Sequence, residues 1–296
     1  MVVVGAHCPG LLMRVRSVPR PGETVLGWKL EEPLDGGKAT NQAVAAARSG
    51  APVSLVSVVG DDERGRALLG LLAQEGIDAA YLELRPGATD IGVVILPEDG
   101  IPAIVSLCDR GRDLDAAFVA TAGAACRAAS VVVCQLEAPQ EAAVAAFALA
   151  REGRAVTVLN PAPAAPLRPD LIALTDILIP NESEAAELAG RPAPPGELAG
   201  RLRAALGIDT VIVTAGPLGA YASLPGGGLL HVPAPPARAV DTTGAGDAFV
   251  GTLACALHQG RPLREAVGLA IAVSSESVTR EGSIPSYPRL VAGALP

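Results

Sequence analysis

Short, nearly uninterrupted apolar runs alternate along this chain with Ala-rich segments of helical period, and this alternation restricts the possible folds. Runs of this length that are rich in Val, Ile and Leu are typical of parallel strands covered by helices on both faces. The expected strands are Val2–Val4, Val53–Val59, Val131–Gln135, Ala155–Leu159, Ile177–Ile179 and Val211–Thr214. The expected helices are Asn41–Ser49, Glu63–Glu75, Pro139–Glu152, Asn181–Ala189 and Pro195–Leu206. This order predicts one α/β domain over residues 1–296, with a doubly wound, mostly parallel sheet flanked by helices.

Two segments, about 11–34 and 89–107, break the alternation because neither contains a helical pattern. Each has strand-like pieces around a turn signal, Pro19-Arg20-Pro21-Gly22 in the first and Glu98-Asp99-Gly100 in the second. We expect the two segments to pair into a small antiparallel sheet beside the main domain. Such a sheet would cover the crevice at the carboxyl ends of the strands, where α/β folds bind ligands. The pattern therefore predicts a lid, with an inert edge sheet as the alternative.

The composition argues against several classes of partner. Hydrophobic residues make up 50% of the 296 residues but aromatic residues only 2%, so few rings are present to stack on nucleic acid bases. The net charge is −8 and the basic residues are scattered, which argues against nucleic acid and anionic membranes as partners. No apolar run reaches the roughly 20 residues that a membrane span requires.

The five cysteines are odd in number and show no CxxC spacing, so neither a disulfide framework nor a zinc site is expected. Reduced thiols are typical of cytoplasmic proteins, and we expect a cytoplasmic location. Only three histidines are present, which argues against a histidine-rich metal centre.

The stretch Asp241-Thr-Thr-Gly-Ala-Gly-Asp-Ala-Phe249 precedes an expected helix, Ala248–His258. Its small residues let the backbone approach a ligand and leave N–H groups unpaired, and these groups favour phosphate together with the helix dipole. Asp247 would repel a phosphate, but it can take the proton from a hydroxyl that attacks the phosphate. An anion cradle beside a base predicts a kinase that acts on an alcohol. A Gly-rich turn with a helix-capping Asp is the alternative.

A second Gly-rich element, Gly36-Gly37-Lys38-Ala39-Thr40-Asn41, leads into the first expected helix. Paired glycines let backbone amides approach a polar ligand, and Lys38 and Asn41 can hydrogen-bond hydroxyls. An ordinary turn before a helix is the alternative. The element lacks the frame of a Walker A motif, and no G-x-G-x-x-G follows Val4, so an NAD-dependent oxidoreductase is not indicated.

Polar residues also follow several expected strands, and the carboxyl ends of parallel strands meet at one edge of a sheet. Glu137 follows one such strand, and Asn181 and Glu184 follow another. Asn181 and Glu184 can hold a magnesium-bound phosphate through water, or they can cap a helix. The loop Thr214–Gly219 ends a further strand and can bracket a nucleotide.

Together these motifs resemble the PfkB family of carbohydrate kinases nearly end to end, and its ribokinase branch most of all. The matching stretches are Gly36–Asn41, Val59–Asp62, Gln135–Glu137, Asn160–Ala164, Pro180–Glu184 and the highly specific Asp241–Phe249. The resemblance implies a ribokinase-like α/β domain with a β-sheet lid, dependence on ATP and Mg²⁺, and often a homodimer joined through the lids.

The resemblance also implies roles for single residues. Asp247 corresponds to the catalytic base, and Gly244, Ala245 and Gly246 to the anion hole for the transferring phosphoryl group. The sugar-contacting positions are Gly36, Gly37, Lys38, Asn41, Glu137 and Asp247. The nucleotide positions are Asn181, Thr214, Gly216, Gly219 and Gly246, and Glu184 would hold Mg²⁺ through water. The potassium positions are Asp241, Thr243, Ser277, Arg280, Gly282 and Ser286, several of them through backbone carbonyls.

The sequence departs from the family pattern at two places that are expected to contact the sugar. Ribokinases usually carry an Asp near the end of the first strand that holds sugar hydroxyls, and Gly10 stands there in this chain. Losing a charged partner would cost about 1.5–3 kcal/mol of binding. The stretch 109–113 replaces a small-residue Gly-Ala-Asn segment. His7 and Cys8 lie where the first strand meets the crevice, and they can either contact the substrate or pack beneath the lid.

These observations predict ATP-dependent phosphorylation of a primary hydroxyl on a small sugar, with ribose the leading candidate. Fructose, a keto-sugar acid and a nucleoside are the alternatives within the kinase class, and the scarcity of aromatic rings argues mildly against the nucleoside. A non-catalytic sugar or nucleotide sensor is less favoured, because a sensor has no need of a base at Asp247.

Overall fold

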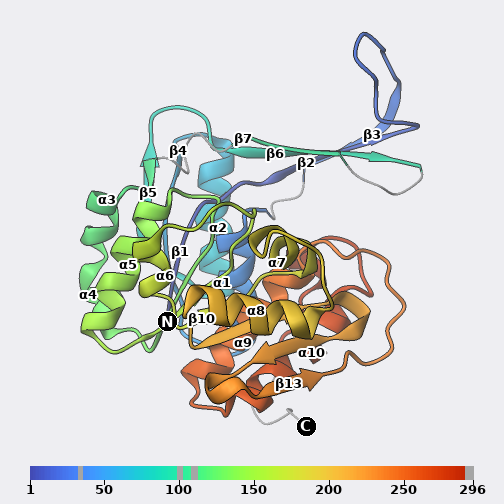
Figure 1. Ribbon diagram of the computed structural model, residues 1–296. Helices are drawn as coiled ribbons and strands as arrows, with labels where there is room; N and C mark the ends of the chain where they lie inside the picture. Colours follow the sequence, from blue (N-terminus) through green and yellow to red (C-terminus); the bar gives the residue numbers. More distant parts are fainter. Residues whose placement is uncertain (33–35, 99–102, 108–112, 291–296) are drawn as a thin grey trace.

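The computed structural model describes residues 1–32, 36–98, 103–107 and 113–290. Its largest element is a nine-stranded sheet in the order β13-β12-β11-β10-β9-β8-β1-β4-β5 (Figure 1). The strands are β1 (Val2–Val4), β4 (Ser54–Gly60), β5 (Asp78–Arg85), β8 (Val131–Cys134), β9 (Val156–Leu159), β10 (Ile177–Leu178), β11 (Thr210–Thr214), β12 (Ala220–Ser223) and β13 (Leu229–Val232). All neighbours from β5 to β11 are parallel, and β12 and β13 add an antiparallel edge. The predicted doubly wound, mostly parallel sheet is confirmed.

Helices cover both faces of this sheet. One face carries α1 (Lys38–Arg48), α2 (Glu63–Glu75), α9 (Ala245–His258) and α10 (Leu263–Ser277). The other carries α3 (Ala116–Thr121), α4 (Gly123–Ala128), α5 (Gln140–Glu152), α6 (Pro169–Ala173), α7 (Glu182–Leu188) and α8 (Pro195–Leu206). Val3 packs against the first group and Val2 and Val4 against the second, which explains why β1 is apolar throughout. Among the described residues, no helix combines the length and the apolar character that crossing a membrane requires.

A second sheet extends from the main domain (Figure 1), in the order β3-β2-β6-β7. Its strands are β2 (Gly10–Val15), β3 (Gly27–Glu31), β6 (Ile91–Pro97) and β7 (Ala103–Leu107), and they come from the two segments expected to form a lid. The expectation of an antiparallel sheet is wrong at its centre, because β2 and β6 are parallel. The chain enters β2 from β1 and β6 from β5, which point the same way in the main sheet, so β2 and β6 leave it in the same direction.

Two helices begin earlier than the apolar period predicts. Helix α1 begins at Lys38 instead of Asn41, and α9 begins at Ala245 instead of Ala248. Each follows a glycine with positive φ, 77° at Gly37 and 74° at Gly244, that starts the helix without a side-chain cap. The two signature motifs therefore run into helices whose first turns carry their polar side chains.

The C-terminal end of α1 is joined to α2 and to residues 284–290 by Arg48. Its guanidinium donates to the Glu75 carboxylate at 2.7 and 3.1 Å, and Nη1 donates to the carbonyls of Ile284 and Tyr287 at 2.6 and 2.8 Å. Burial opposes ionisation of Glu75, but hydrogen bonds and charge from Arg48 and Arg289 outweigh it and lower the pKa of Glu75. Arg48 thus holds the C-terminal segment against the main domain.

Replacing Arg48 with Met is expected to lower the free energy of unfolding by about 3 kcal/mol, because it leaves a buried carboxylate and two carbonyls short of a donor. Chemical denaturation measures this change. Arg168→Met is the matched control, since Arg168 pairs with Asp170 at the surface, where a pair contributes less than about 1 kcal/mol. Equal losses in the two variants would contradict the anchoring role of Arg48.

Candidate active site

The first Gly-rich element packs backbone against backbone on the segment that follows β1. A Cβ on Gly36 would lie 2.3 Å from the carbonyl oxygen of Cys8, and one on Gly37 would lie 2.4 Å from the Cys8 nitrogen. Both glycines have positive φ, 144° and 77°. Only glycine permits this approach, which sets the start of α1 beside the end of β1.

His7 lies buried beneath this loop. Its Nδ1 is 3.0 Å from Thr40 Oγ1, and the side chain is 2% exposed. Burial lowers the pKa of His7 to about 4, so the ring is neutral near pH 7. The sequence left substrate contact and packing as alternatives for His7, and its burial corresponds to packing. Cys8 beside it is also buried.

Lys38 lies among three carboxylates at the start of α1. Its backbone N–H donates to Glu137 Oε2 at 2.7 Å. Burial would lower the pKa of Lys38, but the charges of Asp247, Glu137 and Glu184 outweigh it and raise the pKa. Burial raises the pKa of Glu137 to about 7, although Lys38 opposes the shift. The ammonium group therefore stays charged, while Glu137 titrates near neutral pH.

Asp247 projects from the first turn of α9 toward α1 and is 8% exposed. Its Oδ2 accepts from Asn41 Nδ2 at 3.0 Å, and its Oδ1 accepts from Gln42 Nε2 at 2.9 Å. Gly244 is the residue that caps α9, so the alternative of a helix-capping Asp does not describe Asp247.

Gly244 is held by the segment after α10. The Tyr287 hydroxyl donates to the Gly244 carbonyl at 2.9 Å, and a Cβ on Gly244 would lie 2.3 Å from Ser283 Cβ. No side chain caps α9, whose first turn begins with Ala245 and Gly246. The Ala245 N–H donates to the Thr242 carbonyl at 3.3 Å, and Gly246 follows in the turn where α-helices leave N–H groups without an intrahelical partner. This geometry suits an anion at the start of α9.

Two adjoining cavities open at this point, and Thr214 and Gly246 line both of them. The smaller, about 160 Å³, is polar and is lined by Lys38, Asn160, Asn181, Glu184, Gly244 and Asp247, among others. The larger, about 460 Å³, is lined by Gly216, Gly219 and Ala245 together with apolar side chains such as Phe249 and Ile271. The predicted nucleotide positions therefore surround the larger cavity, except Asn181, which lines the smaller one.

Asn181 and Glu184 form a capping box at the start of α7. Asn181 Oδ1 accepts from the Glu184 N–H at 2.9 Å, and Glu184 Oε2 accepts from the Asn181 N–H at 2.8 Å. Burial raises the pKa of Glu184, opposed by this backbone hydrogen bond and by Lys38. The helix-cap interpretation thus describes both residues, and both also line the smaller cavity.

The six predicted potassium positions lie in the loop before α9, at the last residue of α10 and in the segment that follows α10. Asp241 joins the loop to this segment, because its carboxylate accepts from the N–H groups of Thr243 and Gly282, both at 2.9 Å. Burial would raise the pKa of Asp241, but these hydrogen bonds outweigh it and lower the pKa. In the same segment, Arg280 donates from Nη1 to the Ser286 carbonyl at 3.2 Å and from its backbone to the Ser277 carbonyl at 3.3 Å.

Three further residues of the site were not predicted from the sequence as site residues. Gln42 and Asn160 contact each other beside Asp247, and Tyr287 holds Gly244. Gln42 directly follows the predicted Asn41, and Asn160 directly follows β9. Their positions in the sequence were therefore weak indications that they belong to the site. Tyr287 carried none, because its role depends on how the C-terminal segment folds back. The stretch 109–112 lies outside the described residues.

Comparison with known proteins gives a consistent match. The family model described as pfkB family carbohydrate kinase matches residues 32–290. The ribokinase of Schizosaccharomyces pombe is 34% identical, covering 98% of this chain and 95% of its own length. That of Haemophilus influenzae is also 34% identical, covering 97% and 95%. The solved structure of Arabidopsis thaliana ribokinase complexed with ribose and ATP has a TM-score of 0.87 at 27% identity, covering 97% of this chain and 95% of that chain.

Gly244→Ala is expected to lower the free energy of unfolding by about 1–3 kcal/mol, because Gly244 has positive φ and its Cβ would meet Ser283 and Tyr287. Gly246→Ala is the matched control on the same helix turn. A Cβ there meets no atom within 4 Å, and alanine favours a helix by about 1 kcal/mol. Chemical denaturation of both variants measures the difference, and an equally stable Gly244→Ala protein would contradict the tight packing of this loop.

Proposed function

Because the chain belongs to the pfkB family of carbohydrate kinases, we propose that it transfers the γ-phosphoryl group of ATP to a primary hydroxyl of a small sugar, with ribose the first candidate. The observation that carries this proposal is the position of Asp247. Asp247 lines the polar cavity, and Gly246, one residue before it, lines both cavities. A sugar in the polar cavity and a nucleotide in the larger one would therefore meet beside a base.

In this mechanism Asp247 accepts the proton of the sugar hydroxyl as that oxygen attacks the γ-phosphorus. The Gly246 amide donates to the oxygens of the transferring group, where negative charge develops, and the Ala245 amide would join it on leaving the Thr242 carbonyl. Lys38, which stays protonated, lines the same cavity and adds positive charge. The hydroxyl proton thus goes to Asp247, and the bond between the γ-phosphorus and the leaving oxygen of ADP breaks.

Two side chains next to the polar cavity support a polyol there, because Asn41 contacts Asp247 and Glu137 contacts Lys38, and both Asp247 and Lys38 line the cavity. Asn41 Oδ1 is buried and has no hydrogen-bond partner among the described residues, so it can accept from a sugar hydroxyl. Glu137 is held by the Lys38 N–H and, once ionised, can accept from a second hydroxyl. The lid formed by β2, β3, β6 and β7 would close over the sugar and exclude water.

Magnesium and potassium belong to the proposal as well. Asn181 and Glu184 line the polar cavity, and their oxygens are of the kind that would hold, through water, an Mg²⁺ bound to phosphates. When bound, Mg²⁺ supplies positive charge to the phosphate oxygens. The carbonyl-rich loops joined by Asp241 suit K⁺ beside the anion hole. Cys126, Cys134 and Cys255 form no disulfide, which fits a reducing cytoplasm.

The substrate itself is tested by sugar-dependent ADP release with Mg-ATP and KCl. Ribose is compared with fructose, keto-sugar acids and nucleosides. Turnover that is highest on ribose supports the first candidate, whereas higher turnover on another acceptor moves the specificity within the family. Folded protein that binds sugar but never releases ADP would favour the sensor.

Asp247→Asn is expected to lower kcat by at least about 100-fold, because the amide cannot take the hydroxyl proton. The Kd of ATP should stay within a small factor, since the larger cavity is unchanged. Steady-state ADP release and calorimetric ATP binding measure the two quantities. A variant that retains near-full turnover would remove Asp247 from the mechanism.

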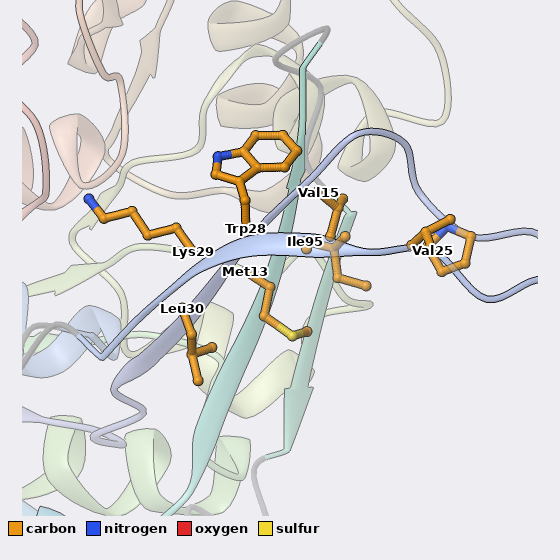
Figure 2. A pocket seen from close by; sticks show the side chains of 9 residues that line it. Met13, Val15, Val25, Trp28, Lys29, Leu30 and Ile95 are labelled. Carbon is orange, nitrogen blue, oxygen red and sulfur yellow. The ribbon is translucent and has the colours of Figure 1, made fainter.

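We also propose that two copies of the chain associate through the lid. Leu30, Met13 and Ile95 lie side by side on β3, β2 and β6, and Trp28 and Val105 are 56% and 55% exposed. Met13, Trp28, Leu30 and Ile95 line a hollow of about 440 Å³ with their neighbours. Figure 2 shows the side chains that line it. An apolar face of this kind is unusual on a monomer, and a second copy offers a matching one.

Leu30→Glu is expected to convert a dimer to a monomer, because the carboxylate would be buried against the partner's apolar face. Sedimentation velocity gives the oligomeric state. Leu229→Glu is the matched control, since Leu229 is 58% exposed on β13, away from the lid. A wild-type protein that is monomeric at micromolar concentration, or a dimer that both variants leave intact, would contradict assembly through the lid.

A further inference from the structure

The buried amides around Asp247 form a continuous chain of hydrogen bonds. Gln42 is fully buried, and both hydrogens on its Nε2 are used, one by Asp247 Oδ1 at 2.9 Å and one by Asn160 Oδ1 at 3.0 Å. Its Oε1 accepts from Gln135 Nε2 at 2.6 Å. With donors and acceptor all engaged, the Gln42 amide has one orientation available to it.

The far side of this chain is fixed to the main sheet. Gln135 directly follows β8 and Asn160 directly follows β9. Asn160 Nδ2 donates at 2.8 Å to the carbonyl of Ile179, which follows β10. Because that donor faces Ile179, the Oδ1 of Asn160 must face Gln42. The carboxylate on α9 is therefore connected through Gln42 to the ends of three adjacent strands.

We infer that Gln42 is the positioning residue for Asp247, and this inference rests on the proposed role of Asp247 as the base. Asn41 and Gln42 each donate to a different oxygen of the carboxylate, so together they fix the rotation of its plane. Both residues lie on α1, but only Gln42 is also hydrogen-bonded to the strand-end residues Gln135 and Asn160. Asn160 and Ile179, at two of those ends, line the polar cavity in which the acceptor hydroxyl would lie.

Packing alone does not account for this chain. Burying an amide is unfavourable unless its hydrogen bonds are made, and a Leu or Met side chain would fill the space at position 42 without that cost. Lys38 attracts Asp247 while Glu137 and Glu184 repel it, but neither kind of charge interaction defines the plane of a carboxylate. The hydrogen bonds from Asn41 and Gln42 do.

The test compares kcat with KM in Gln42→Leu and Gln42→Glu. Leu removes every hydrogen bond, while Glu keeps the shape and the acceptor for Gln135 but places an oxygen against Asp247. In both variants kcat should fall roughly 10- to 100-fold, with the KM values of sugar and ATP nearly unchanged, because the base is misplaced while the binding surfaces remain. Circular dichroism establishes that each variant is folded, and the Glu variant keeps the test decisive if Leu unfolds the protein.

Ser49→Ala is the matched control, because it removes another buried hydrogen bond between α1 and α9, the one between the hydroxyls of Ser49 and Thr252 at 3.1 Å, about two turns from Gln42. Its kcat should equal that of the wild type. Folded Gln42 variants that match Ser49→Ala in kcat, while Asp247→Asn is inactive, would overturn the positioning role and leave the proposed function standing. If Asp247→Asn itself turns over normally, the proposed function fails and this inference falls with it.

Discussion

Helices α1 and α9 touch backbone to backbone, and the arrangement of the site depends on this contact. A Cβ on Gly251 would lie 2.3 Å from the Gln42 carbonyl oxygen and 2.7 Å from Ala45 Cβ, so only glycine allows the helices to come this close. One turn earlier on α9, Asp247 is then within hydrogen-bond distance of Asn41 and Gln42. The two Gly-rich signatures, far apart in sequence, become one site through this approach.

The sheet supplies the other half of the site. Strands β8, β9, β10 and β11 end at one edge, where Gln135, Asn160 and Asn181 follow the first three strands and Thr214 is the last residue of β11. The site is assembled where these strand ends meet the starts of α1 and α9. Carbonyl and carboxylate groups from the strand ends face amide donors from the helix starts, which gives the crevice both polarities needed to hold a hydroxyl and a phosphate. Apolar side chains from α9 and α10 leave room for a nucleotide beside it.

Much of this arrangement could be predicted from the sequence, because apolar runs indicate buried elements and glycines indicate close approach of the backbone. Helices α2 and α8 begin and end at the predicted residues, and the structure places Asp247, Lys38 and Thr214 around one cavity. Side-chain hydrogen bonds between segments far apart in the sequence could not be predicted, because no local sequence pattern determines them. Gln42 and Tyr287 depend on such contacts. The parallel pairing of β2 with β6 likewise depends on a distant feature, the shared direction of β1 and β5, from which the chain enters these two strands.

The most direct test of this account is a crystal structure of the protein with sugar and a non-hydrolysable ATP analogue. The account predicts a primary sugar hydroxyl within about 3 Å of an Asp247 oxygen and in line with the γ-phosphorus. It also predicts that Gln42 still donates to the other side of that carboxylate. A bound sugar whose hydroxyls all lie beyond hydrogen-bond reach of Asp247, with the γ-phosphate placed elsewhere, would contradict the central claim.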